Sequence, residues 1–266
     1  MKCLNCGTEY EGKFCPECGQ SAKTGRFTMK FIVENMATAV LGRDGSIWFT
    51  IKSLFTRPGE MILDNLNGKR KKYFSPFPML FMVLALFILI TTITNSLTIN
   101  KIQNSDYVTD SPADASTDEV FSRESKHIIA DFTKLYYSHY TLATLLTLPL
   151  AVVAARACYG RNNRKRYYWA EYAITVVYAM VIVFLFRCLV HLLYPISPLT
   201  MTRIDIAGSP LVSIIAYTVC FRKMLGFSVV KTAWRSILTE LLYNLMLLVL
   251  ILFMAVILAV YLALKY

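Results

Sequence analysis

Four of the seven cysteines lie within the first 18 residues, in two pairs of identical spacing. In each pair two residues separate the cysteines, and a glycine directly follows the second one. Two thiolates at this spacing can hold one metal ion from a tight turn, and the glycine permits a positive φ beside the sulfur atoms. The pairs together supply four sulfur ligands, which is the donor set of a closed tetrahedral site: Cys3, Cys6, Cys15 and Cys18.

Such a donor set favours one structural zinc ion per chain. A four-thiolate iron centre is chemically possible, because iron also accepts four sulfur ligands. Disulfides would require an oxidising compartment, and a thioredoxin-like redox pair would require one C-x-x-C beside a βαβ pattern. The residues between the pairs suit one β-hairpin with Tyr10 and Phe14 as its small core, so residues 1–22 are predicted to form a zinc ribbon. A closed site has no open coordination position, so we expect no catalysis at the metal.

The composition of the rest argues against a wholly soluble protein. Of the 266 residues 56% are hydrophobic and 17% are charged, whereas soluble domains have about 25% charged residues. The formal net charge is +11. In a soluble protein that charge would indicate nucleic-acid binding, but in a membrane protein it indicates which loops lie in the cytoplasm.

Five segments are apolar over roughly the length that crosses a bilayer, which is about 20 residues. We therefore predict an all-α polytopic membrane protein with a membrane domain over residues 74–266. The fourth segment is the weakest because it includes Asp205, and its alternative is a re-entrant or interfacial segment. The five predicted spans are 74–97, 136–157, 172–194, 204–221 and 237–264.

Basic residues alternate with these spans and predict their orientation. Lys and Arg gather before the first span, between the second and third, and between the fourth and fifth. The 99–135 loop is acidic and the 195–208 loop has few charges. Because basic loops stay in the cytoplasm, we expect a cytoplasmic N-terminus, an external C-terminus and an external loop at 99–135. The polar N-terminal sequence predicts no cleavable signal peptide.

An amphipathic helical linker is expected over residues 23–73. A first helix is predicted over 27–41 and a turn at 42–45. Ser46 can cap a second helix, and Pro58 fits the first turn of a short third helix that ends at Leu66. These helices either lie on the inner membrane surface or pack as a small hairpin on the cytoplasmic ends of the spans.

Two ionisable residues of the third span form a candidate intramembrane polar site. Arg187 and His191 are four residues apart and therefore share one face of the helix. Charges inside a bilayer are costly, so such residues are functional candidates. Alternatively, Arg187 extends its side chain to the outer headgroups.

The motifs CLNCG and FCPECGQ, followed by RPG and GKRKKYFSP before the first span, resemble an uncharacterised bacterial family of membrane proteins with an N-terminal zinc ribbon. The resemblance implies a bacterial inner-membrane location and no specific activity. The layout of five spans with the N-terminus inside is also similar to the Yip family of membrane-traffic proteins, in topology alone. The matching positions before the first span are Arg57, Pro58, Gly59, Gly68, Lys69, Arg70, Lys72, Tyr73, Phe74 and Pro76.

No P-loop, dinucleotide fingerprint or HExxH motif occurs, so we expect a non-enzymatic interaction or regulatory module. Its expected partners are the bilayer, anionic lipid headgroups and a cytoplasmic protein that docks on the zinc ribbon. Nucleic acid is not expected, because the ribbon lacks a broad basic and aromatic face. The alternatives are a small transporter or channel that uses Arg187 and His191, and a lipid-modifying membrane enzyme. The candidate headgroup or partner contacts are Arg57, Lys69, Arg70, Lys72 and Tyr73.

Overall fold

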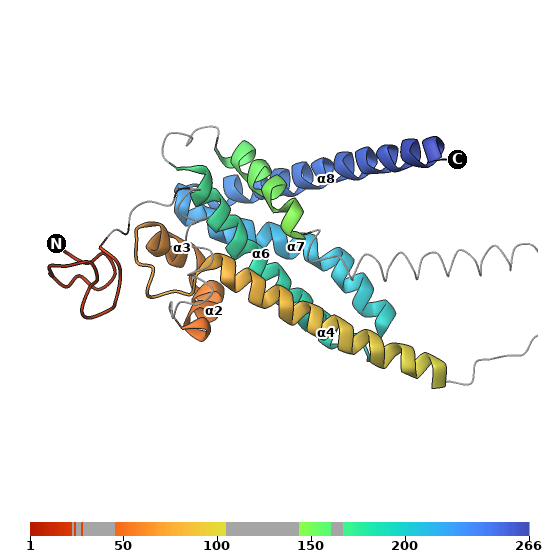
Figure 1. Cartoon of the computed structure of the whole chain (residues 1–266), viewed down its shortest axis with the longest axis horizontal. Coiled ribbons are helices and arrows are strands. Elements are labelled where there is room, and N and C mark those ends of the chain that lie inside the picture. The colour runs from red at the N-terminus through yellow and green to blue at the C-terminus, as the bar shows by residue number, and fades with distance from the viewer. Residues whose placement is uncertain (23, 25–27, 29–45, 105–143, 161–166, 266) are drawn as a thin grey trace, which may run out of the picture.

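The described part of the chain is helical apart from its N-terminal unit and its loops. The computed structural model describes residues 1–22, 24, 28, 46–104, 144–160 and 167–265 (Figure 1). An apolar helix at Thr144–Tyr159 precedes α6. The labelled helices are α2 (Ile47–Thr56), α3 (Pro58–Leu66), α4 (Pro76–Asn104), α6 (Trp169–Leu192), α7 (Pro198–Leu225) and α8 (Val229–Lys265).

Four of these helices contain segments long and apolar enough to cross a membrane, which indicates a membrane protein. The segments correspond to the first, third, fourth and fifth predicted spans, so the weak fourth segment is a full-length helix despite Asp205. The count of five is not established, because only Thr144–Tyr159 of the second predicted span is described. The four segments are Pro76–Thr94, Trp169–Leu192, Thr200–Leu225 and Val229–Phe253.

Three further predictions lie wholly or partly outside the described residues. They are the linker helix at 27–41, the turn at 42–45 and most of the loop at 99–135. At the start of that loop, α4 continues as a helix to Asn104.

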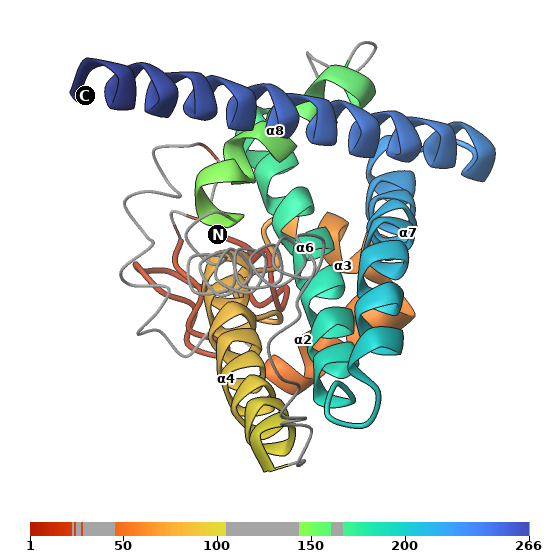
Figure 2. The same cartoon turned by 90° about the vertical axis from the view of Figure 1, so that its right-hand side faces the viewer.

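Helix α6 lies at the centre of the bundle. It packs against α4 on one side and α7 on the other, and α7 in turn packs against α8 (Figure 2). In an apolar stretch of 18 residues, 61% of the residues of α6 are buried, compared with 11% of those of α8. Helix α8 diverges from the others (Figures 1 and 2), so most of the apolar surface of its segment Val229–Phe253 is left for lipid.

Helices α2 and α3, here called the cap, pack on one end of this bundle. Ser46 caps α2 by accepting a hydrogen bond from the Phe49 amide at 3.3 Å, and α3 begins at Pro58, as the sequence predicts. Met61 and Ile62 of α3 are fully buried. Trp48 of α2, by contrast, is 75% exposed. Helix α3 therefore packs on the ends of the bundle helices, which is the second of the two predicted arrangements. Helix α2 leaves the side chain of Trp48 exposed.

Buried polar groups join the cap to the bundle. Asn65 of α3 donates to the hydroxyl of Tyr178 on α6 at 3.0 Å, and that hydroxyl donates to the carbonyl of Phe74 at 2.9 Å. Thr50 of α2 accepts from the Phe74 amide at 2.8 Å. Because buried polar groups are costly when unpaired, this network fixes α2, α3 and the start of α4 on α6.

Gly59 lets α3 approach α7 closely. A Cβ at this position would lie 2.6 Å from Cβ of Lys223 and 3.1 Å from the carbonyl oxygen of Val219. Both distances are shorter than an ordinary van der Waals contact, and the neighbouring atoms belong to the backbone or the root of a side chain. Close packing therefore explains the glycine of the RPG motif.

We predict that Gly59→Ala destabilises the cap by about 1–3 kcal/mol, because the added methyl group overpacks the contact between α3 and α7. Thermal unfolding of the detergent-solubilised protein measures this change. The control is Glu60→Ala, which removes only the exposed ion pair between Glu60 and Lys223 and should cost less than about 1 kcal/mol. Equal unfolding temperatures for the Gly59 variant and the parent would contradict the packing argument.

Candidate metal centre

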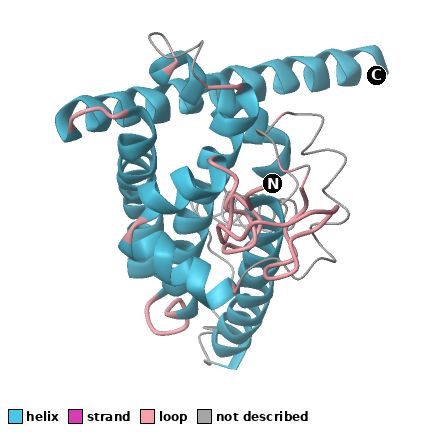
Figure 3. Ribbon diagram, turned by 90° about the vertical axis from the view of Figure 1, so that its left-hand side faces the viewer, coloured by secondary structure: helices cyan, strands magenta, loops and turns pink. Residues whose placement is uncertain are grey.

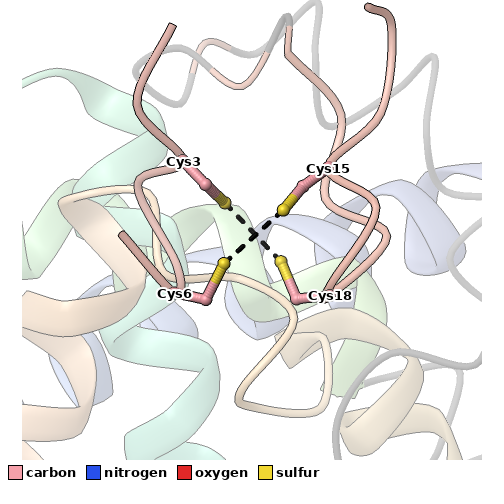
Figure 4. Close-up of side chains that lie close together, drawn as sticks. All are labelled: Cys3, Cys6, Cys15 and Cys18. Atoms are coloured by element: carbon pink, nitrogen blue, oxygen red, sulfur yellow. Dashed lines mark hydrogen bonds between the residues drawn. The ribbon is translucent and has the colours of Figure 1, made fainter. Parts of the chain in front are cut away.

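The four N-terminal cysteines converge on one point (Figure 4). Their sulfur atoms all lie within 4.8 Å of one another. The Sγ atoms of Cys3 and Cys18 are 3.5 Å apart, as are those of Cys6 and Cys15. A tetrahedral site with metal–sulfur bonds of about 2.3 Å has sulfur–sulfur edges of about 3.8 Å. The cluster therefore fits one four-coordinate metal ion.

Each cysteine pair forms its own tight turn. In the first turn the Cys3 amide donates to the Thr8 carbonyl at 2.9 Å and the Gly7 amide donates to the Cys3 carbonyl at 3.0 Å. The second turn repeats the pattern: the Cys15 amide donates to the Gln20 carbonyl and the Gly19 amide donates to the Cys15 carbonyl, both at 2.9 Å. Gly7 and Gly19 have φ values of 82° and 69°, which L side chains rarely adopt, so both positions favour glycine.

The single β-hairpin predicted between the pairs is not found in this part of the chain. Lys2 instead pairs with Glu9 and Phe14 with Ser21, as two isolated bridges, and the unit is drawn as loop (Figure 3). The physical reason is that each turn folds back on itself and uses its own backbone donors. Phe14 is 63% exposed, so its assignment to a small core was wrong.

The thiols of this cluster differ in their affinity for protons. Hydrogen bonding with the side chain of Thr8 lowers the pKa of Cys6 to about 6, whereas burial raises the pKa of Cys18 to about 11. A metal ion binds cysteine as the thiolate. Binding of a metal ion here would therefore displace protons from the cluster.

The cysteine unit, residues 1–22, docks on the loop that joins α3 to α4, residues 67–75. The side chain of the buried Gln20 accepts a hydrogen bond from the Arg70 amide at 3.2 Å. Leu4 covers Gly68, where a Cβ would lie 2.8 Å from a Leu4 methyl carbon. Gly68 also has a φ of 96°. One residue from each turn thus contacts the joining loop.

Asp64 of α3 gathers several of the residues predicted to contact headgroups. It accepts from Lys69 Nζ at 2.8 Å and from the Tyr73 hydroxyl at 3.0 Å, and Lys72 Nζ lies 3.6 Å away. Burial alone would raise the pKa of Asp64, but these hydrogen bonds and charges leave it below its usual value. Burial also raises the pKa of Tyr73 to about 12.

Of the remaining two residues of that predicted set, Arg70 belongs to the joining loop and Arg57 directly precedes α3. Burial lowers the pKa of Arg70 to about 10, and the guanidinium of Arg57 lies 6.0 Å from the ring centroid of Phe49. The predicted headgroup role of all five residues stays a prediction.

Arg187 and His191 meet a carboxylate that sequence reasoning did not assign to their site. Arg187 Nε lies 3.2 Å from Asp205 on α7 and donates to Ser209 at 2.9 Å. His191 Nε2 lies 3.8 Å from the other oxygen of Asp205. A second carboxylate, Glu240 of α8, accepts from a serine of α7 at 2.6 Å. The signal for Asp205 was its charge within an apolar segment, which requires a partner on a neighbouring span.

The comparisons with known proteins add one local similarity. A family model described as "Protein of unknown function (DUF3667)" matches residues 44–88. This stretch holds the cap, the joining loop and the start of α4, including the RPG and GKRKKYF motifs, but not the four cysteines. No curated protein and no solved structure matches the chain.

We predict that the intact protein purifies with one tetrahedrally bound metal ion per chain and that Cys15→Ser abolishes this stoichiometry. Chelation should open residues 1–22 to protease, because a unit this small cannot fold without its metal. The membrane helices should persist, since they satisfy their own backbone hydrogen bonds. Elemental analysis measures the metal, and Cys158→Ser is the control because Cys158 lies outside the cluster. Full metal content in the Cys15 variant would contradict the assignment.

Proposed function

We propose that this chain is a five-span protein of a bacterial inner membrane, whose cytoplasmic face carries a structural zinc unit that serves as an interaction or regulatory module. The closed four-thiolate arrangement supports a structural rather than a catalytic ion, and zinc is the metal for which this donor set is typical. Stoichiometric iron in the elemental analysis would replace this proposal with redox sensing.

The observation that carries the proposal is the surface of the cysteine unit. Phe14 and Met1 are 63% and 62% exposed, although a unit of 22 residues has few large apolar side chains. Because these two side chains lie in water, they contribute little to the stability of the cysteine unit itself. Apolar side chains that stay in water on such a unit can supply the contact area for a partner protein.

The position of the basic residues supports the proposed orientation. Lys69, Lys223, Lys231 and Arg235 all lie at the end of the bundle where the cap and the cysteine unit pack. Basic residues favour the cytoplasmic side of a bilayer. The apolar helix Thr144–Tyr159 overlaps the proposed second span, 136–157, and so supports the proposed count of five.

The direct test is a comparison of the proteins that co-purify with the intact chain and with Phe14→Ser. We expect at least one cytoplasmic protein to be enriched roughly tenfold with the parent. Loss of one aromatic anchor that a partner buries commonly costs about 2 kcal/mol, which is enough for a tenfold change in affinity. Quantitative mass spectrometry after gentle cross-linking measures the enrichment. Glu11→Ser, another exposed position of the unit, is the control and should keep the partner.

Loss of the same protein in Cys15→Ser would tie the interaction to the metal. If the parent and the Phe14 variant retained identical sets of proteins, the docking role would be refuted.

A second candidate function, a small transporter or channel, is favoured by one observation. Asp205, which is 9% exposed, joins Arg187 and His191 between two helices of membrane-spanning length. Ionisable groups in such positions often mark ion or proton pathways. A purely structural ion pair is the alternative, and only a flux measurement separates the two.

For a transport role we predict that Asp205→Asn lowers proton flux into reconstituted vesicles about tenfold or more, while the protein still folds. A pH-sensitive dye inside the vesicles measures the flux. Arg187→Ala leaves the buried carboxylate without its partner and should destabilise the fold by about 3–5 kcal/mol. Arg187→Lys keeps the charge and is the milder comparison. Flux no greater than that of empty vesicles would refute proton transport.

A further inference from the structure

A cleft at the cap end of the bundle has the features of a lipid-binding site. Its volume is about 340 Å³, within the range of about 300–1,000 Å³ that is usual for ligand pockets. It lies between the helix Thr144–Tyr159 and the start of α6. Among the residues that the structure describes, the cleft is lined by Val153, Arg156, Ala157 and Trp169.

Aromatic rings hold the guanidinium of Arg156 in place at this cleft. Its central carbon lies 4.4 Å from the ring centroid of Trp169 and 5.4 Å from that of Tyr172. Nη1 donates to the carbonyl of Tyr167 at 3.2 Å. A guanidinium carries several N–H donors, so an anion can be bound in addition to this carbonyl. The nearby carboxylate of Glu171 is engaged in capping α6, because it accepts from the Tyr168 amide at 2.7 Å.

The cleft changes from charged to apolar along its length. Arg156 and Ala157 lie in the last turn of their helix, at the end of the bundle that carries the cap, and Val153 lies one turn deeper. Val153 is 40% exposed and Trp169 is 46% exposed, so the walls face outward from the bundle. Trp is enriched at the level of the lipid headgroups. With Trp169 at that level, Arg156 would face the phosphates and Val153 would face the first acyl carbons.

We propose that this cleft binds one anionic phospholipid, with its phosphate on Arg156 and its glycerol and upper acyl chain along Val153 and Ala157. The charge of Arg156 complements an anionic headgroup, and the order of polar and apolar surface matches that of a lipid. The site is separate from the cysteine unit and from the Arg187 cluster, and it rests on the proposed second span but not on the roles proposed for those two sites.

Trp169 serves as the reporter for the test. The chain has three tryptophans, so Trp48→Phe and Trp234→Phe leave Trp169 as the sole tryptophan. This variant is reconstituted in phosphatidylcholine vesicles that contain one brominated lipid. The brominated lipid is phosphatidylglycerol in one sample and phosphatidylcholine in the other. Bromine quenches tryptophan at short range, so the quenching ratio gives the preference for the anionic lipid.

We expect brominated phosphatidylglycerol to occupy the neighbourhood of Trp169 about fivefold more than brominated phosphatidylcholine, the ratio expected for one basic residue at the membrane surface. Arg156→Gln should reduce this ratio to near one. Ala157→Phe should also reduce it, because the ring fills the cleft while the charge remains. This second variant tests the site even if the first fails to fold.

Two controls separate a site from general attraction to the basic surface. Lys231→Gln removes a charge at the same end of the bundle and should leave the preference unchanged. A variant whose sole tryptophan is Trp234, which is 62% exposed, should show no preference.

Equal quenching of Trp169 by both lipids, or a preference that survives Arg156→Gln, would overturn the proposal. Loss of the preference in millimolar inorganic phosphate would assign the cleft to a free anion and overturn it as well.

Discussion

The buried hydrogen bond between Asn65 of α3 and Tyr178 of α6 is the contact on which the arrangement of this chain depends. The Tyr178 hydroxyl also donates a hydrogen bond to the carbonyl of Phe74, so this one group joins the cap, the start of α4 and the central helix of the bundle. In a buried setting each of these groups would be costly if unpaired. The cap is thus fixed to the membrane helices by polar constraint as well as by the apolar burial of Met61 and Ile62.

The cysteine unit is attached to the cap indirectly, through the joining loop. Leu4 and Gln20 of the unit contact this loop. Two residues of the loop, Lys69 and Tyr73, donate hydrogen bonds to Asp64 of α3. Release of the cysteine unit would therefore loosen the joining loop, whereas the hydrogen bond between Asn65 and Tyr178 would still hold the cap on the membrane helices. The similarity to the family of unknown function covers the cap and the loop, which are the parts that make these contacts.

Features set by neighbouring residues could be predicted from the sequence. The cysteine spacing predicted the cluster, and Ser46 and Pro58 predicted where α2 and α3 begin, because capping and proline geometry are local. Features set by distant residues could not. Phe14 was expected inside a hairpin, yet the two turns close separately. Asp205 is visible as a charge in an apolar segment, but only the packing of α7 on α6 brings it to Arg187.

The most direct test of the link between metal and membrane is hydrogen–deuterium exchange of the intact protein before and after chelation. The account predicts that removal of the metal speeds exchange in residues 1–22 and also in residues 67–72, because Leu4 and Gln20 then leave the loop. The first turns of α4, from Pro76 onward, should stay protected. Gln20→Ala should reproduce part of the effect in the loop while the metal stays bound. Faster exchange in residues 1–22 with no change in residues 67–72 would contradict the account.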